Sequence, residues 1–189
     1  MNLNLFKKIA TRPSAELFLA LILFSAGISL RFLPHAPNFS PLSAIALFGG
    51  TYFSKRKALV LPMTIMIVSD MLLGFYEIKL MAAVYGSLLL SVVLGFWLKN
   101  NKKWYWVAGS AALSATLFFL ITNFAVWAFT PWYPKTFSGL LQSYLMALPF
   151  FKNNLLGNLF FASCFFGAYE TIKVLLKTQQ CAPLRSKNS

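Results

Sequence analysis

Six apolar stretches separated by short polar connections organise the chain. They cover residues 16–30, 41–53, 58–74, 80–98, 104–129 and 153–172 of the 189-residue sequence. Stretches this apolar predict membrane-spanning helices. The expected fold is therefore all-α: a polytopic membrane bundle of six spans in a single domain, 16–174, between a cytoplasmic N-terminus, 1–15, and a basic cytoplasmic tail, 175–189.

The second stretch is too short to cross a membrane alone. As a helix it would cover about 20 Å of a hydrocarbon core that is about 30 Å thick. The irregular segment before it, 32–40, must fill the remaining thickness. Irregular backbone is tolerated at that depth only where protein or water surrounds it. The sequence therefore predicts a cavity beside this segment, near the outer face.

Two segments allow alternative interpretations. Residues 137–151 are expected to form an outer-face amphipathic or re-entrant helix that ends at Pro149. As a seventh span they would move the basic tail outside and weaken the charge asymmetry described below. The N-terminal basic residues before the first apolar run also fit a signal peptide ending near Ala26 and Gly27, whose removal would leave five spans.

Basic residues indicate the topology, since Lys and Arg accumulate in cytoplasmic loops. Thirteen of the 17 lie in four patches. The patches are Lys7, Lys8 and Arg12; Lys55, Arg56 and Lys57; Lys99, Lys102 and Lys103; and Lys173, Lys177, Arg185 and Lys187. Only Arg31, Lys79, Lys135 and Lys152 lie in the other gaps. This pattern predicts a multi-pass protein of the bacterial inner membrane with both termini in the cytoplasm.

Composition favours the same class, because 58% of the residues are hydrophobic and only 11% are charged. The net charge of +13 lies in membrane-flanking segments, so the expected partner is anionic inner-leaflet lipid and not nucleic acid. Cys164 and Cys181 lack metal-ligand spacing and are expected to be free thiols. We expect neither a metal nor a cofactor.

Polar groups inside the spans concentrate near the predicted outer ends. Such groups are energetically costly within a membrane, so their placement indicates a functional site. They are Arg31, Asp70, Asn123, Asn153, Asn154 and Asn158. The exception is Glu16, which lies at the inner end of the first span and faces Arg12 at an i,i+4 spacing.

Helical spacing places Asn123 with Trp127, and Asn154 with Asn158, on single helix faces. Amides beside aromatic rings are typical of a small-molecule pocket. Two other interpretations stay open: the amides could bridge helices in packing, and Arg31 with Asp70 could form a fixed ion pair.

Two outer connections are rich in proline. Residues 32–41 read FLPHAPNFSP, in which three prolines exclude helix and stiffen the chain. His35, the sole histidine, is either a hydrogen-bonded loop residue or a ligand contact. Residues 130–135 read TPWYPK, where Trp132 and Tyr133 either anchor the chain at the membrane interface or stack on a ligand.

Several motifs resemble a known family. They are PNF at 37–39, SD-xxx-G at 69–74, TNF-x-VW at 122–127, YP at 133–134 and ALPFF at 147–151. Together they resemble an uncharacterised family of small bacterial membrane proteins described as candidate transport proteins. That family is similar in size and six-helix layout to the substrate-binding S components of energy-coupling-factor vitamin transporters, a likeness of layout only.

The resemblance implies a transport protein that binds a vitamin or other small organic nutrient in an outward-facing cavity. The implied substrate-binding residues are Arg31, His35, Asn38, Phe39, Asp70, Asn123, Trp127, Asn154 and Asn158. At position 158 the family usually has an aspartate, so this chain lacks a charge there. An energy-coupling transmembrane partner with its ATPases would dock on small residues. Candidates are Ser87, Ser91, Gly95, Ala108, Ala111, Ala112 and Ala115, which could equally pack the chain's own helices.

Two other function classes remain. A membrane enzyme would have only Asp70 and His35 as an acid/base pair, without a recognisable catalytic motif, so we expect no catalytic residues. A scaffold of cell-envelope assembly would need no ligand and would fill the outer cavity with side chains. The chain has no P-loop, so an ATP-driven step would belong to a partner.

Overall fold

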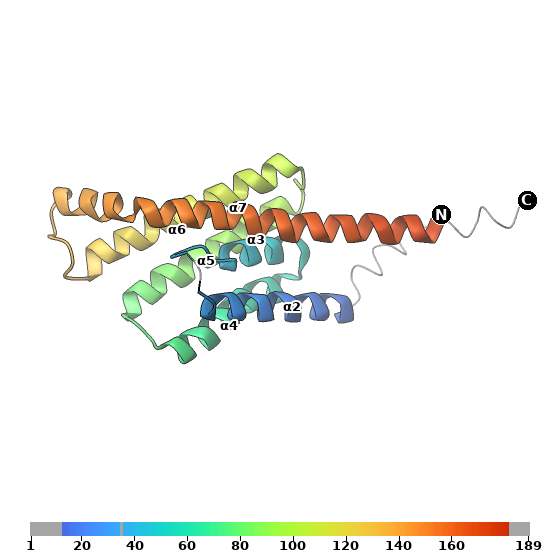
Figure 1. Cartoon of the computed structure of the whole chain (residues 1–189), viewed down its shortest axis with the longest axis horizontal. Helices are drawn as coiled ribbons and strands as arrows, with labels where there is room; N and C mark the ends of the chain where they lie inside the picture. Colours follow the sequence, from blue (N-terminus) through green and yellow to red (C-terminus); the bar gives the residue numbers. More distant parts are fainter. Residues whose placement is uncertain (1–12, 35, 182–189) are drawn as a thin grey trace, which may run out of the picture.

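The computed structural model describes residues 13–34 and 36–181, with side chains from 18 to 174. The described residues form six helices and no strand, which confirms the all-α fold class (Figure 1). The helices are α2 (Pro13–Phe32), α3 (Leu42–Tyr52), α4 (Lys55–Leu73), α5 (Ile78–Leu98), α6 (Trp104–Phe129) and α7 (Phe137–Cys181). Most of the predicted terminal segments, and the side chains of Glu16 and Cys181, lie outside the described residues.

Local signals explain where the helices begin and end. Pro13 opens α2, a position that needs no backbone donor. Gly74, with φ of +100°, ends α4 in a conformation that favours glycine. The Glu77 carboxylate caps α5 by accepting hydrogen bonds from the N–H groups of Lys79 and Leu80 at 2.8 and 2.9 Å. The first five helices begin and end within three residues of the predicted stretches.

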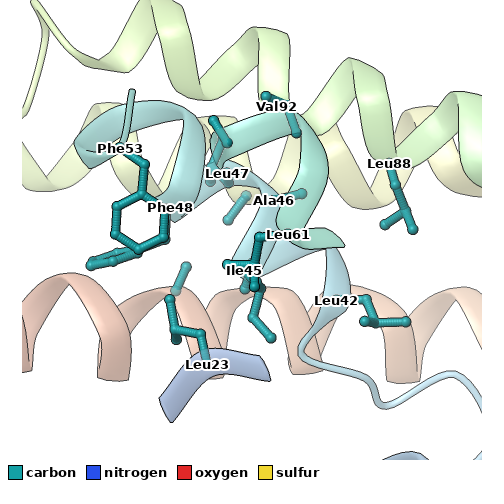
Figure 2. Close-up of a cluster of buried hydrophobic side chains, with 14 of the residues drawn as sticks. Leu23, Leu42, Ile45, Ala46, Leu47, Phe48, Phe53, Leu61, Leu88 and Val92 are labelled. Atoms are coloured by element: carbon teal, nitrogen blue, oxygen red, sulfur yellow. The ribbon is translucent and has the colours of Figure 1, made fainter. Parts of the chain in front are cut away.

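Helix α3 is the centre of the bundle. It contacts all five other described helices, and every residue from 42 to 51 is buried. Ile45, Leu47 and Phe48 of α3 pack against Leu23 of α2 and Val92 of α5 in the hydrophobic core (Figure 2). With 11 residues the helix is only about 16 Å long. The prediction of a short second helix is confirmed, and the protein encloses this helix on all sides.

Two glycines bring α3 and α5 into backbone contact. A Cβ on Gly50 would lie 2.3 Å from the carbonyl oxygen of Val92 and 2.8 Å from Cα of Gly95. The Thr51 hydroxyl donates to the carbonyl oxygens of Leu47 and Gly95 at 2.9 and 3.2 Å. The helices therefore touch along a strip that has no room for larger side chains.

Most of the candidate docking residues lie inside this packing. Ser87, Ser91, Gly95, Ala111 and Ala115 are buried, and Ala108 and Ala112 are half-buried. The hydroxyls of Ser91 and Ser114 share a hydrogen bond between α5 and α6. For the buried five, the interpretation as internal packing residues is confirmed.

Helix α7 corrects one prediction. It runs without interruption through Pro149 for 45 residues, about 67 Å. The segment before the last span is helical as expected, but Pro149 does not end it. A proline costs one backbone hydrogen bond, and apolar helices tolerate that loss where neighbouring helices support them. The first part of α7 is therefore continuous with the last predicted span.

Three helices of the described chain are long and apolar enough to cross a membrane: Ile78–Leu98, Trp104–Phe129 and Phe137–Val174. Phe18–Phe32 and Leu42–Tyr52 are shorter apolar stretches. The α3–α4 and α5–α6 connections, the start of α2 and the end of α7 lie toward one end of the long axis (Figure 1). We call it the basic end, because it holds Lys55, Arg56, Lys57, Lys99, Lys102 and Lys103. The α2–α3, α4–α5 and α6–α7 connections lie toward the opposite end.

Candidate functional site

A buried ion pair joins α2 to α4. Nη2 of Arg31 lies 2.8 Å from Oδ1 of Asp70, and the Tyr85 hydroxyl of α5 donates to Oδ2 of Asp70 at 2.9 Å. Asp70 is 1% exposed, whereas the Arg31 side chain is 20% exposed. The predicted approach of Arg31 and Asp70 is confirmed. Both carboxylate oxygens are engaged, so the ion pair presents its cationic side to the surroundings.

A cavity of about 270 Å³ lies over the N-terminal end of α3. We call it the polar cavity. From the α2–α3 and α4–α5 connections it is lined by Asn38, Ser40 and Tyr76. From the helices it is lined by Arg31, Leu42, Ser43, Met66, Leu73, Val84, Leu88, Phe118 and Asn154. The cavity lies where the sequence predicts one, because α3 stops short and an irregular segment occupies the remaining height.

A second cavity of about 220 Å³ adjoins the first between α5, α6 and α7. We call it the aromatic cavity. Four residues line both: Asn38, Val84, Phe118 and Asn154. Its other lining residues are Phe119, Thr122, Asn123, Val126, Ala147, Phe150 and Phe151. Polar groups are thus concentrated in one cavity and aromatic rings in the other.

The segment between α2 and α3 is held against α7. The Asn153 side-chain amide donates to the carbonyl oxygen of Pro37 at 3.0 Å, and the Phe39 ring lies 5.4 Å from that of Phe161. Gly157 leaves room for this contact, since a Cβ there would lie 3.3 Å from Cα of Phe39. Asn38 adopts a left-handed conformation with φ of +64°, which asparagine tolerates better than most residues. These contacts position Asn38 at the junction of the two cavities.

Two amides of α7 are linked. Nδ2 of Asn158 donates to Oδ1 of Asn154 at 2.9 Å. Asn154 lines both cavities and is 6% exposed, and its own Nδ2 has no acceptor among the described residues. Asn158 is fully buried, and its Oδ1 has no partner in the described part of the chain. Asn158 therefore lines neither cavity and contacts the cavity residue Asn154.

Tyr76, in the α4–α5 connection, adds a hydroxyl to the polar cavity. Desolvation, and then the negative charge of Asp70, raise its pKa to about 12, against a smaller opposing effect of Arg31. The hydroxyl therefore stays protonated at neutral pH and can donate a hydrogen bond.

Other predicted site residues line the aromatic cavity alone or lie outside both cavities. Asn123 lines the aromatic cavity, and its Nδ2 donates to the carbonyl oxygen of Phe119 at 2.8 Å. Trp127 lines neither cavity; its Nε1 donates to the carbonyl oxygen of Pro134 at 3.0 Å. Lys135 also binds the carbonyl oxygen of Trp127. Trp127 thus stabilises the α6–α7 connection. Phe39 packs on α7 without lining a cavity, and His35 lies outside the described residues.

Residues that sequence reasoning missed complete the site. Tyr85 binds Asp70. The polar cavity is also lined by Tyr76, Ser40, Ser43, Val84 and Phe118. For Phe118 and Phe119 a signal existed, because they lie about one helical turn before Asn123.

Glu170 is a second acidic residue near the basic end. It accepts a hydrogen bond from the Tyr52 hydroxyl at 2.7 Å and forms an ion pair with Lys173 at 2.9 Å. Glu16 is therefore not the single exception near the inner ends of the predicted spans, because Glu170 is a second one. Within the described residues no group of three or more His, Cys, Asp or Glu side chains could hold a metal ion.

Comparison with known proteins assigns the chain to a family. Residues 10–181 match the model described as "Family of unknown function (DUF6580)". The chain belongs to this family. Every residue of both cavities lies inside the part of the chain that matches DUF6580. Neither the curated proteins nor the solved structures gave a match.

Proposed function

We propose that this DUF6580 chain is a membrane uptake protein, similar in layout to the S components of vitamin transporters, that binds a small organic nutrient in its two cavities. The polar cavity would face outside, and the basic end would lie in the cytoplasm. Six crossings, with both termini inside, agree with the distribution of basic residues. An energy-coupling partner would supply the driving force, since the sequence has no P-loop.

One observation carries this proposal: a polar and an aromatic cavity adjoin at the end of the bundle where α3 stops short. Their lining residues come from all six described helices and two connections, so unrelated parts of the chain converge there. A polar cavity that adjoins an apolar one supplies both the orienting polar groups and the apolar walls that are typical of small-molecule sites. A scaffold needs no ligand, so its side chains would be expected to fill this volume.

The proposal can be tested by blocking the cavities without disturbing the bundle. Val84 lines both cavities, and Val93 lies on the same helix with 55% of its surface exposed. We would purify wild type, Val84→Trp and Val93→Trp in lipid nanodiscs and identify co-purified small molecules by mass spectrometry. The proposal predicts a metabolite that is present in wild type and Val93→Trp and depleted at least about tenfold in Val84→Trp, equivalent to about 1.4 kcal/mol of binding free energy.

Uptake of the identified metabolite by cells that express each variant would complete the test. Equal small-molecule content in all three samples, with equal melting temperatures, would contradict a ligand role for the cavities and favour the scaffold interpretation.

A further inference from the structure

We infer that the ligand has an anionic head, a carboxylate or a group of similar charge, and an apolar, preferably aromatic, body. The head would lie in the polar cavity and the body in the aromatic cavity. This inference rests on the proposed function, because it names the chemical class that the same site would bind.

The charge exposed to the polar cavity is positive. Arg31 lines this cavity, while its partner Asp70 does not. Asp70 is instead enclosed by Arg31 and Tyr85, one on each carboxylate oxygen. A guanidinium has five N–H donors, and of those on Arg31 one contacts Asp70 and another the sulfur of Met66. Donors therefore remain for an anion that enters from the cavity side.

Hydrogen-bond donors converge on the same space. The first residues of α3, Leu42 and Ser43, line the polar cavity. The Ser40 hydroxyl oxygen accepts from the N–H of Leu42 at 3.4 Å, while the N–H groups of Ser43 and Ala44 have no partner among the described residues. The unpaired N–H groups and the positive end of the helix dipole favour a negative group there. A second donor is independent of the helix end: the Nδ2 group of Asn154, a residue that is more than nine-tenths buried, lacks an acceptor in the described chain.

Acidic groups that could bind a cationic ligand do not line either cavity. The chain has four acidic residues. Among the described side chains, Asp70 is enclosed, Glu77 caps α5 and Glu170 binds Tyr52 and Lys173. A cation placed at Arg31 would be repelled and left without a partner, which is costly away from water. The site thus discriminates by charge.

The aromatic cavity suits the other part of the ligand. Phe118, Phe119, Phe150 and Phe151 line it, and the rings of Phe119 and Phe151 lie 4.7 Å apart. These two rings pack on one another, and together with the other rings they form an apolar wall against which a planar or apolar group can pack. Asn123 provides an amide at this wall. Because Asn38 and Asn154 line both cavities, one molecule can extend from the first into the second.

A matched set of probes can test the inference before the natural ligand is identified. We would measure binding of 3-phenylpropionate, 3-phenylpropionamide and 3-phenylpropylamine to the protein in nanodiscs by thermal shift and calorimetry. These probes share the phenyl body and differ in the charge of the head. We expect the acid to bind at least about tenfold more tightly than the amide and the amine to bind more weakly than the amide.

The double variant R31Q/D70N identifies the source of this preference. It removes both charges together, so neither is left buried without its partner. We expect the preference for acid over amide to fall below about threefold, a difference that a neutral hydrogen bond can supply. The control is Lys79→Gln. Lys79 is exposed and lies at the same end of the bundle as the cavities, but it lines neither of them. Its removal should leave the preference for acid over amide unchanged.

The outcomes separate the inference from the proposed function. If acid and amide bind equally, or the amine binds best, the anionic class is wrong while a ligand cavity stands. If neither acid nor amide binds up to the solubility limit, the inference is also overturned, and the proposed function then depends on the co-purification experiment alone. An acid preference that survives in R31Q/D70N would show that Arg31 is not its source and would overturn that part of the inference.

Discussion

The two ends of α3 differ in how densely they are packed. At its C-terminal end, the Phe48 and Tyr52 rings lie among the rings of Phe166 and Tyr169, with centroids 4.2 to 5.6 Å apart. At its N-terminal end, Leu42 and Ser43 line a cavity of about 270 Å³. The same buried helix therefore contributes packing at one end and open volume at the other.

This difference indicates how a small bundle can keep a cavity. Close contact between α3 and α5, and the aromatic cluster beyond it, bury apolar surface at the end of α3 that lies toward the basic end. Burial of this kind is the main source of stability. The opposite end can then stay hollow at a tolerable loss of stability, with Arg31 and Asn154 lining the space. Variants at the two ends should separate stability from binding.

The largest effect is expected at the contact between α3 and α5. In Gly50→Ala the new Cβ would meet the backbone of α5 at 2.3 Å, and backbone atoms cannot move aside as a side chain can. We expect a loss of about 3 kcal/mol or more, the upper range for overpacking, read as lost monodisperse protein after purification. Gly86→Ala is the control in α5, since no atom lies within 4 Å of its Cβ. Equal yields of the two variants would contradict the close contact.

Removing a ring at each end tests the comparison directly. Phe48 is 1% exposed in the packed end, so Phe48→Ala should cost about 3–5 kcal/mol of unfolding free energy. Phe118 is half-buried and already borders both cavities, so Phe118→Ala should cost about 1–2 kcal/mol, because less packing is lost. Unfolding in a denaturing detergent provides the measurement. A larger cost for Phe118→Ala would reverse the assignment of the packed end.

Removing one partner of the Arg31–Asp70 ion pair should cost less stability, and removing the second partner as well should restore part of it. Asp70→Asn leaves Arg31 without its counter-charge, and we expect a loss of about 2 kcal/mol, below the full range for buried pairs because Arg31 is 20% exposed. R31Q/D70N should recover at least about half of that loss, since it strands no charge. The thermodynamic cycle of the two single variants and the double variant measures the coupling. A double variant less stable than both single variants would contradict this account.

The smallest effects are expected at Trp127 and Asn123, which share one face of α6. Trp127→Phe removes the hydrogen bond to Pro134 and should cost about 1 kcal/mol without changing the affinity for the probe acid. Asn123→Ala removes an amide from the aromatic cavity and should weaken binding of the same acid about tenfold. Melting temperature and calorimetry together distinguish the two. The reverse pattern would place Trp127 in the binding site.

The amino-acid sequence predicts those features of the fold and the site that depend on local composition. The positions of the first five helices follow from apolar runs and the prolines, glycines and charges between them. The ion pair followed from the cost of isolated charges, since Arg31 and Asp70 were the only opposite charges at one height.

The rest depends on tertiary contacts. Pro149 has a local preference to end a helix, yet α7 continues because its neighbours support it. Trp127 and Asn123 share a face, but the α6–α7 connection folds back to bind the indole. Tyr85 became a partner of Asp70 through the packing of α5 against α4, which no spacing in the sequence indicates.

The most direct test of the central claim is the reactivity of single cysteines on α5 toward an impermeant thiosulfonate reagent added to spheroplasts. With Cys164→Ser and Cys181→Ser as background, Val84→Cys samples the cavities and Val92→Cys samples the packed contact, where Val92 is fully buried. The account predicts modification of Val84→Cys from outside, slowed by the co-purified metabolite, and no modification of Val92→Cys. Protection of both positions, or modification of Val84→Cys only from the cytoplasmic side, would contradict it.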